Sequence, residues 1–220
     1  MVNFVLLIHN FTKYSKKDID KGNTPLDIYN LCSSIRETFC LSYSIRKNNN
    51  LYFYLQNSYE LIKFEGKSLR FLGPDERSQA LLLNKALLRT NQLTYFENWV
   101  KSTPGIFVRK FKDESRVLNY FRILLEERAI MISEVESKEN DFLSLLTLIG
   151  LKEIENYFFL LPTYKKINIL NDFIRNLAKN IKITYISFPS ITSIENKILN
   201  INYLIDRIRN TNLNNDFKER

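Results

Sequence analysis

The sequence predicts an α/β protein with a mostly parallel β-sheet and helices on both faces. The first observation is that short apolar segments alternate with segments in which apolar residues recur every three or four positions, as strands alternate with helices. The second is that the strand segments Val2–Ile8 and Tyr157–Leu161 are almost continuously apolar, which is typical of strands buried in a parallel sheet. With 220 residues, the chain is long enough to bury a substantial core as one domain.

The elements of the N-terminal half follow from the spacing of apolar residues and from the turn residues around them. The first strand, Val2–Ile8, leads into a polar segment, Lys13–Thr24, which we interpret as a loop. A helix begins at Leu26, because apolar residues recur from there at helical spacing. The further predicted elements are a turn at Asn48–Asn50, strands at Leu51–Leu55 and Leu61–Phe64, a helix at Asp75–Thr90 and a strand at Ile106–Phe111.

The C-terminal half continues the alternation. Residues 134–141 are acidic and polar and precede the apolar stretch Phe142–Ile149, so we expect an inserted helix over about 134–150. The chain is polar after Thr211, so we expect a single domain over 1–210 and a fraying tail over 211–220. The other predicted elements are a helix around Val117–Leu125, strands at Arg128–Ile132, Tyr157–Leu161 and Ile183–Phe188, and helices at Ile167–Leu177 and Ile191–Ile208.

The last predicted helix carries a continuous stripe of isoleucine. Such a stripe either covers the core of its own chain or meets a partner, and the sequence leaves both alternatives open. The stripe consists of Ile191, Ile194, Ile198, Ile201, Ile205 and Ile208.

Composition and motifs narrow the functional classes. The formal net charge of +8 favours an anionic partner such as nucleic acid. Cys32 and Cys40 are too few for a disulfide framework and lack metal-site spacing, so we expect reduced thiols in a cytoplasmic protein without a metal. The apolar run Phe4–Ile8 is too short for a signal sequence or a membrane span. The absence of Walker, GxGxxG, GxSxG and HExxH patterns argues against the common nucleotide-binding and hydrolase sites.

The stretch 73–112 organises the chain, because two sharp turns bracket one helix. Pro74 is predicted to occupy the first helical position, and Asp75 to lie where the positive end of the helix favours a carboxylate. Pro104–Gly105 forms the second turn. The strand after it interleaves an aromatic residue with cations, which suits a polyanion that carries bases. These residues are Phe107, Arg109, Lys110 and Lys112.

Two segments of this stretch, GPDERSQALLLNKAL and STPGIFVRK, carry a family resemblance. They resemble the paired segments of the archaeal tRNA pseudouridine-54 N1-methyltransferases, a family of the SPOUT superfamily, and weaker similarity extends over about residues 2–206. The resemblance implies an α/β trefoil knot, in which the C-terminal segment threads a loop, and a homodimer through the C-terminal helix. It also implies S-adenosylmethionine (SAM) as cofactor and tRNA as substrate, with methyl transfer to N1 of pseudouridine 54 in the T-loop.

The resemblance also implies roles for individual residues. Methyl transfer to N1 needs a carboxylate base and cations near the developing oxyanion. The expected catalytic carboxylates are Asp27 and Asp75. The residues expected to bind RNA are Arg46, Arg77, Arg109 and Lys110. The residues expected at the cofactor are Ile132, Pro162, Ile186, Ser187, Phe188 and Lys197.

The sequence departs from the family at the cofactor loop. The family loop is rich in glycine, which lets the backbone approach the adenosine, whereas this chain reads Leu161-Pro162-Thr163-Tyr164-Lys165-Lys166 and has no glycine after Gly150. Pro25 and Ser44 also stand where the family has arginine and aspartate. Two alternatives therefore remain. One is an RNA-binding or scaffold protein that has lost SAM, and the other is an enzyme of the related rRNA pseudouridine methyltransferase branch.

Overall fold

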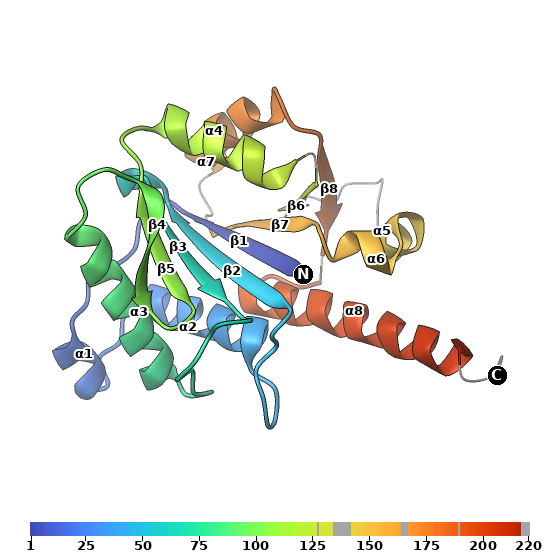
Figure 1. The fold of residues 1–220 in the computed structure, drawn as a ribbon, viewed down its shortest axis with the longest axis horizontal. Coiled ribbons are helices and arrows are strands. Elements are labelled where there is room, and N and C mark those ends of the chain that lie inside the picture. Colours follow the sequence, from blue (N-terminus) through green and yellow to red (C-terminus); the bar gives the residue numbers. More distant parts are fainter. Residues whose placement is uncertain (127, 134–141, 164–166, 189, 217–220) are drawn as a thin grey trace.

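The computed structural model describes residues 1–126, 128–133, 142–163, 167–188 and 190–216. These residues contain one eight-stranded sheet with the strand order β4-β5-β3-β2-β1-β7-β6-β8 (Figure 1). The strands are β1 (Val2–Ile8), β2 (Asn49–Leu55), β3 (Glu60–Glu65), β4 (Phe96–Thr103), β5 (Ile106–Lys110), β6 (Ala129–Ser133), β7 (Phe158–Pro162) and β8 (Ile183–Ser187).

The sheet is mixed, and its parallel part is built around β1. This strand pairs in parallel with β2 on one side and with β7 on the other, and β6 pairs in parallel with β7 and β8. The pairs β2–β3, β3–β5 and β4–β5 are antiparallel. The predicted mostly parallel sheet is therefore confirmed, with an antiparallel extension toward β4.

Helices cover both faces of the sheet, as the sequence predicts. Buried side chains of α2, α3, α5 and α8 form one core cluster with the sheet, and those of α4 and α7 form a second cluster. Figure 1 shows α4 and α7 together above the sheet and α2 and α8 below it. The helices are α1 (Lys16–Asp20), α2 (Leu26–Phe39), α3 (Glu76–Asn91), α4 (Glu114–Leu125), α5 (Phe142–Ile149), α6 (Leu151–Ile154), α7 (Ile167–Ala178) and α8 (Ile194–Asp216), with a short 3-10 helix at Gln56–Ser58.

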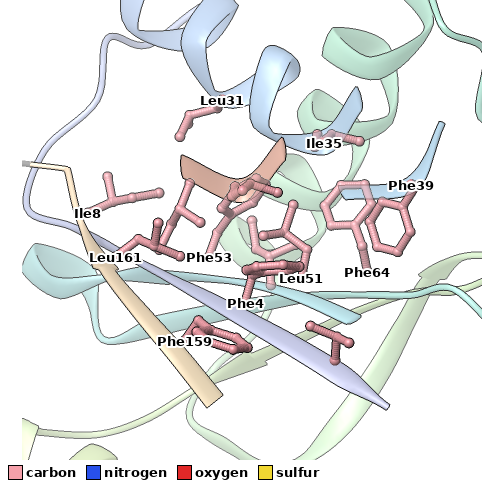
Figure 2. Close-up of a cluster of buried hydrophobic side chains, with 14 of the residues drawn as sticks. Phe4, Ile8, Leu31, Ile35, Phe39, Leu51, Phe53, Phe64, Phe159 and Leu161 are labelled. Atoms are coloured by element: carbon pink, nitrogen blue, oxygen red, sulfur yellow. The ribbon is translucent and has the colours of Figure 1, made fainter. Parts of the chain in front are cut away.

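Aromatic rings and branched side chains fill the layer between the sheet and α2 (Figure 2). Phe4 of β1 stacks on Phe159 of β7, with 5.6 Å between the ring centroids. Phe64 of β3 meets Phe53 of β2 edge to face at 5.7 Å, and Ile35 of α2 is fully buried in the same cluster. Burying each such side chain stabilises the fold by about 1.5–3 kcal/mol, so this layer holds α2 on the sheet.

The isoleucine stripe of α8 faces the protein's own core, in the cluster that also contains α2. A buried amide adds a polar anchor beside the stripe. Asn202 Nδ2 donates to the Glu37 carbonyl at 2.9 Å, and Asn202 Oδ1 accepts from Asn49 Nδ2 at 3.0 Å. The stripe therefore covers the core of its own chain, which decides the alternative that the sequence leaves open. Its fully buried members are Ile198, Ile201 and Ile205.

Besides the 3-10 helix, three short elements are not predicted from the sequence. α1 lies inside the segment expected to be a loop, and β4 and α6 lie in segments to which the sequence analysis gives no strand or helix. The structure also places Asn49 and Asn50 in β2 rather than in a turn. Packing of α1 and β4 on α3, pairing of β4 with β5, and packing of α6 on α5 and α8 thus create structure where local patterns are weak.

Other boundaries also differ from the predictions. Pro74 lies outside α3, because Asp75 is the N-cap and accepts a hydrogen bond from the Ser78 N–H at 2.8 Å. α8 begins at Ile194 rather than Ile191 and continues to Asp216, so residues 211–216 of the expected tail are helical. The apolar part of the expected inserted helix is α5, whereas residues 134–141 lie outside the described residues.

Candidate functional site

A pocket opens where β1 and β7 end, side by side in the sheet. α2 follows β1 on one face of the sheet and α7 follows β7 on the other. Adjacent strands whose connections leave toward opposite faces create a crevice in which α/β proteins bind ligands. Figure 2 shows Ile8 and Leu31, two of its lining residues, at one end of the α2 layer. This strand-end pocket has a volume of about 340 Å³ and is lined by Leu6, Ile8, Asn10, Phe11, Asp27, Asn30, Leu31, Ser34, Pro162, Thr163, Thr192, Ser193, Ile194 and Glu195.

Asp27 lies in the first turn of α2 and lines the strand-end pocket. Its Oδ2 accepts a hydrogen bond from the Thr12 N–H at 2.5 Å, and its Oδ1 accepts one from the Ile28 N–H at 3.0 Å. The N-terminus of α2 also favours a negative charge at this position. The carboxylate is therefore held in one orientation beside the pocket, where it can accept a proton.

The end of β7 forms another part of the wall. Pro162 pairs in register with Leu7 of β1. The N–H and the Oγ1 of Thr163 both donate to the Leu7 carbonyl, at 3.1 and 2.9 Å. Because both bonds end on β1, the backbone is fixed where it leaves the sheet. Asp27 and Pro162, far apart in the sequence, are thus brought together in one pocket.

The N-terminus of α8 completes the lining of the pocket. Ser193 Oγ is buried and has no hydrogen-bond partner within the part of the chain that the structure describes. A buried hydroxyl without a partner costs free energy, so a ligand that bonds this atom gains affinity. An apolar wall, the carboxylates of Asp27 and Glu195, and polar groups at two helix N-termini can together hold a molecule of nucleoside type.

Most of the residues expected at the cofactor lie outside the pocket. Ile132 of β6 and Ile186 of β8 pair in register, and both are buried in the core. The Phe188 ring packs against an aromatic ring of α5, with 5.7 Å between the centroids. Ser187 ends β8, and Lys197 is buried in the first turn of α8. These residues surround the end of the parallel sheet but do not line the cavity at β1 and β7.

A second hollow lies between the end of β5 and α4, and we call it the cationic groove. The Arg109 guanidinium lies 4.4 Å from the Tyr120 ring centroid and 4.7 Å from that of Phe111. Lys110 forms an ion pair with the buried Glu60 carboxylate at 3.0 Å. The groove therefore brings together two of the residues expected to bind RNA. It measures about 430 Å³ and is lined by Tyr95, Arg109, Lys110, Phe111, Lys112, Arg116, Asn119, Tyr120 and Ile123.

Three other expected residues line neither site. Arg46 lies 2.6 Å from Asp206 of α8, in a half-buried ion pair. Arg77 forms an exposed ion pair with Asp20 of α1 at 2.7 Å. Asp75, the third of these residues, caps α3. In the structure the two arginines thus join separate elements of the fold, and Asp75 serves the start of its own helix.

Several lining residues are missed by the sequence analysis. Asn30 lies one turn after Asp27 on α2, so helical spacing is a signal that could have found it. Ser193 and Tyr95 carry no local signal, because folding alone brings their segments to the pocket and the groove.

Among the described residues, no group of three or more histidine, cysteine, aspartate or glutamate side chains is placed to bind a metal ion. Within the same residues, no helix has both the length and the apolar character needed to cross a membrane.

Known proteins resemble the chain over much of its length. The model of a family described as "Putative SAM-dependent RNA methyltransferase" matches residues 1–140. A tRNA (pseudouridine(54)-N(1))-methyltransferase of Methanococcoides burtonii is 34% identical over 135 residues, which cover 54% of this chain and 64% of the relative. The protein of the same name from Haloferax volcanii is 34% identical over 127 residues, 58% of each chain. Its counterpart in Thermococcus kodakarensis is 32% identical over 164 residues, covering 71% of this chain and 81% of the relative.

The matched regions are not spread evenly over the two sites. The chain spans less than two thirds of the length of the first two of these relatives. The family match over residues 1–140 includes Asp27 and the cationic groove, but it ends before Pro162 and the start of α8. The family match therefore includes the α2 side of the strand-end pocket but not its β7 and α8 side.

Proposed function

The protein belongs to the family of SAM-dependent RNA methyltransferases, and we propose that it methylates N1 of pseudouridine 54 in tRNA. The relatives described above are named for this activity. The observation that carries the proposal is that Asp27 and Pro162 line one pocket at the switch point of the sheet. An acid–base group and the expected cofactor loop therefore meet where α/β proteins bind their ligands.

The chemistry of the strand-end pocket fits SAM. Its volume of about 340 Å³ lies within the range of ligand pockets, roughly 300–1,000 Å³. The apolar side chains suit the faces of an adenine ring, the Glu195 carboxylate suits an ammonium group, and the unpartnered Ser193 Oγ suits a hydroxyl or carboxylate. Ser193, Glu195 and Pro162 are thus the residues proposed to hold the cofactor. The apolar members of the lining are Leu6, Ile8, Phe11, Leu31, Pro162 and Ile194.

Asp27 acts as the general base in this proposal. When bound, SAM supplies an electrophilic methyl group attached to a sulfonium. The Asp27 carboxylate, oriented by the Thr12 and Ile28 N–H groups, accepts the N1 proton of pseudouridine and makes that nitrogen nucleophilic. A positioned base of this kind contributes about 10²–10⁴-fold to the rate.

Asn30 is placed to stabilise the charge that this proton transfer creates. Loss of the N1 proton spreads negative charge onto the carbonyl oxygen at C2, next to N1, and through the C5–C6 double bond onto the carbonyl oxygen at C4. Asn30 follows Asp27 by one turn of α2 and lines the same pocket, so its amide can donate a hydrogen bond to such an oxygen. Apolar side chains of the same lining, such as Leu31, lower the local dielectric, which strengthens this interaction.

The trefoil knot and the homodimer that the family resemblance implies are also part of this proposal. We infer a trefoil knot, with the segment leading from β8 into α8 as the threaded part, and a homodimer formed through α8. Because the isoleucine stripe is buried, the exposed side of α8 remains for the partner copy, with Leu199 46% and Tyr203 58% exposed. Sedimentation is expected to show a dimer that Tyr203→Glu converts to monomer. A monomeric parent protein would contradict this part of the proposal.

A second candidate function is RNA binding without SAM. It is favoured by the burial of Ile132 and Ile186 in the core and by the contact of Phe188 with Phe142, because these side chains fill space near the expected cofactor residues. The lack of glycine after Gly150 also favours RNA binding without SAM. An rRNA substrate remains the alternative in which the chemistry is kept and the RNA differs.

Calorimetric titration with SAM separates the two candidates. The methyltransferase proposal expects a binding heat in the micromolar to millimolar range. Ile194→Trp, which fills the strand-end pocket, is expected to weaken binding, whereas Tyr185→Trp on the edge strand β8 leaves it unchanged. Circular dichroism establishes that both variants are folded. No heat at millimolar SAM would contradict the proposal and support the second candidate.

A further inference from the structure

The cationic groove is a site that the proposed methyl transfer does not use. We propose that it binds one unpaired nucleotide of the substrate RNA, with the base on Tyr95 and the phosphate on Lys112 and Arg116. The inference rests on the proposed function only in taking RNA as the substrate. It adds a nucleotide site outside the strand-end pocket.

The charge of the groove suits a phosphate. Four of its lining residues are cations and none is acidic, and both Lys112 and Arg116 are exposed to solvent. Asp113, which lies between them in the sequence, caps α4 by accepting the Arg116 N–H at 3.0 Å. This carboxylate bonds the helix end, and the summed positive charge of the lining residues attracts a phosphate.

The apolar surface of the groove suits a base. Tyr95 is 65% exposed and Ile123 is 66% exposed, although both are large side chains. An exposed aromatic ring beside cations is the combination on which unpaired bases stack in single-stranded nucleic acid binding. A bare phosphate or an acidic polypeptide would leave this ring uncovered, so RNA is the partner that the groove fits.

Arg109 supports the wall of the groove and acts here as a positioning residue. Its guanidinium lies against the rings of Tyr120 and Phe111, and its Nε is buried. Tyr120 in turn meets the Trp99 ring at 6.3 Å between centroids. These stacked groups join α4 to β4 and β5, the elements that border the groove.

The groove and the strand-end pocket lie toward the same ends of the strands, the groove on the α4 face of the sheet and the pocket on the α2 face. Leu7 pairs with Pro162 and with Tyr54, Tyr54 pairs with Leu61, and Leu61 pairs with Arg109. Pro162 and Arg109 are therefore in one row, four strand spacings apart, or about 19 Å at about 4.8 Å per spacing. One folded RNA can reach both sites.

Trp99 provides a direct readout, because it is the single tryptophan of the chain and lies beside a ring that lines the groove. A short single-stranded RNA is titrated without SAM, and we expect it to change the fluorescence of Trp99. Tyr95→Ala should weaken the affinity by about tenfold or more. Lys112→Ala should lower the slope of log affinity against log salt by about one.

Matched controls come from the opposite edge of the sheet, where Tyr185→Ala and Lys182→Ala remove an exposed ring and an exposed cation. Both are expected to leave binding unchanged. Folded Tyr95→Ala and Lys112→Ala variants that bind RNA like the parent protein would overturn the inference, even if methyl transfer occurs. RNA binding that depends on the groove, without methyl transfer, would keep the inference and refute the proposed function. A stronger Trp99 response to polyglutamate than to RNA would overturn it in favour of an acidic protein partner.

Discussion

The carboxylate of Asp27 accepts a hydrogen bond from the backbone N–H of Thr12, with 2.5 Å between Oδ2 and the nitrogen. The bond joins the loop after β1 to the first turn of α2, so both segments form one wall of the strand-end pocket. Because the donor belongs to the backbone, a side-chain amide at position 27 can accept the same bond. The charge of this residue can thus be removed without removing its contact.

Asp27→Asn is expected to abolish most of the methyl transfer while preserving the fold. An amide keeps the oxygen that faces Thr12 but does not accept a proton, so the rate should fall by about 10²–10⁴-fold. Single-turnover methyl transfer at saturating SAM and RNA measures this step. RNA affinity should remain that of the parent protein, and an unchanged rate would exclude Asp27 as the base.

Asn202→Ala should destabilise the fold, since its amide bridges α8 to both α2 and β2. Removing it leaves the partly buried Glu37 carbonyl without this donor and the buried Asn49 amide without this acceptor, which costs about 1–3 kcal/mol. Urea denaturation measures the free energy of unfolding. Asn196→Ala, at an exposed position of the same helix, is the control and should change it by less than about 0.5 kcal/mol. Equal effects of the two variants would show that the bridge contributes nothing.

Gly105→Ala should cost more stability than Gly22→Ala, although both glycines have positive φ, +80° and +72°. A Cβ at Gly105 would meet the Leu69 backbone at 2.2 Å, whereas a Cβ at Gly22 meets nothing within 4 Å. The Gly22 variant should lose about 1–2 kcal/mol from backbone strain alone. The Gly105 variant should lose that amount and, in addition, the cost of the overlap with the Leu69 backbone. Equal losses of unfolding free energy in urea denaturation would contradict this close contact of the β4–β5 turn.

Stability should fall at alkaline pH because of Cys32. Burial raises the pKa of this thiol to about 12, from an ordinary value of 9.0. Between these values the unfolded chain loses a proton that the folded chain keeps, so the free energy of unfolding decreases as pH rises. Below pH 9 the thiol is protonated in both states and contributes no slope. Urea denaturation at about pH 8 and about pH 10.5 measures the decrease in the free energy of unfolding between these two pH values. Cys32→Ala should make this decrease smaller by about 1–2 kcal/mol. An identical fall in the variant would show that the thiol is not buried.

The fold class could be predicted because the central strands are unambiguous. Every residue of β1 and β2 is buried, so both strands contain long apolar runs. α1 is missed because its five residues bury only Ile19 and show no periodicity. The sequence feature that indicates α1 is instead its N-terminal cap, in which Asp18 accepts a hydrogen bond from the Ser15 N–H at 2.8 Å. β4 is missed because its pairing with β5 is irregular and gives no clean alternation.

The candidate site could be predicted only in parts. Asp27 and Pro162 are identified from local segments, but their meeting depends on the pairing of β1 with β7, which no local pattern specifies. Arg109 and Lys110 are identified as cations, whereas Tyr95 joins them only because β4 folds back beside β5. Local chemistry is therefore visible in the sequence, and the assembly of distant segments is not.

The most direct test of the central claim is methyl transfer to tRNA that carries pseudouridine at position 54. Mass spectrometry of the nucleosides should find a methyl group on N1 of this pseudouridine after incubation with SAM. A matched tRNA with uridine 54 should remain unmethylated, because N1 of uridine is bonded to the ribose and has no proton for Asp27 to accept. Folded protein that binds SAM and this tRNA but leaves pseudouridine 54 unmethylated would contradict the account.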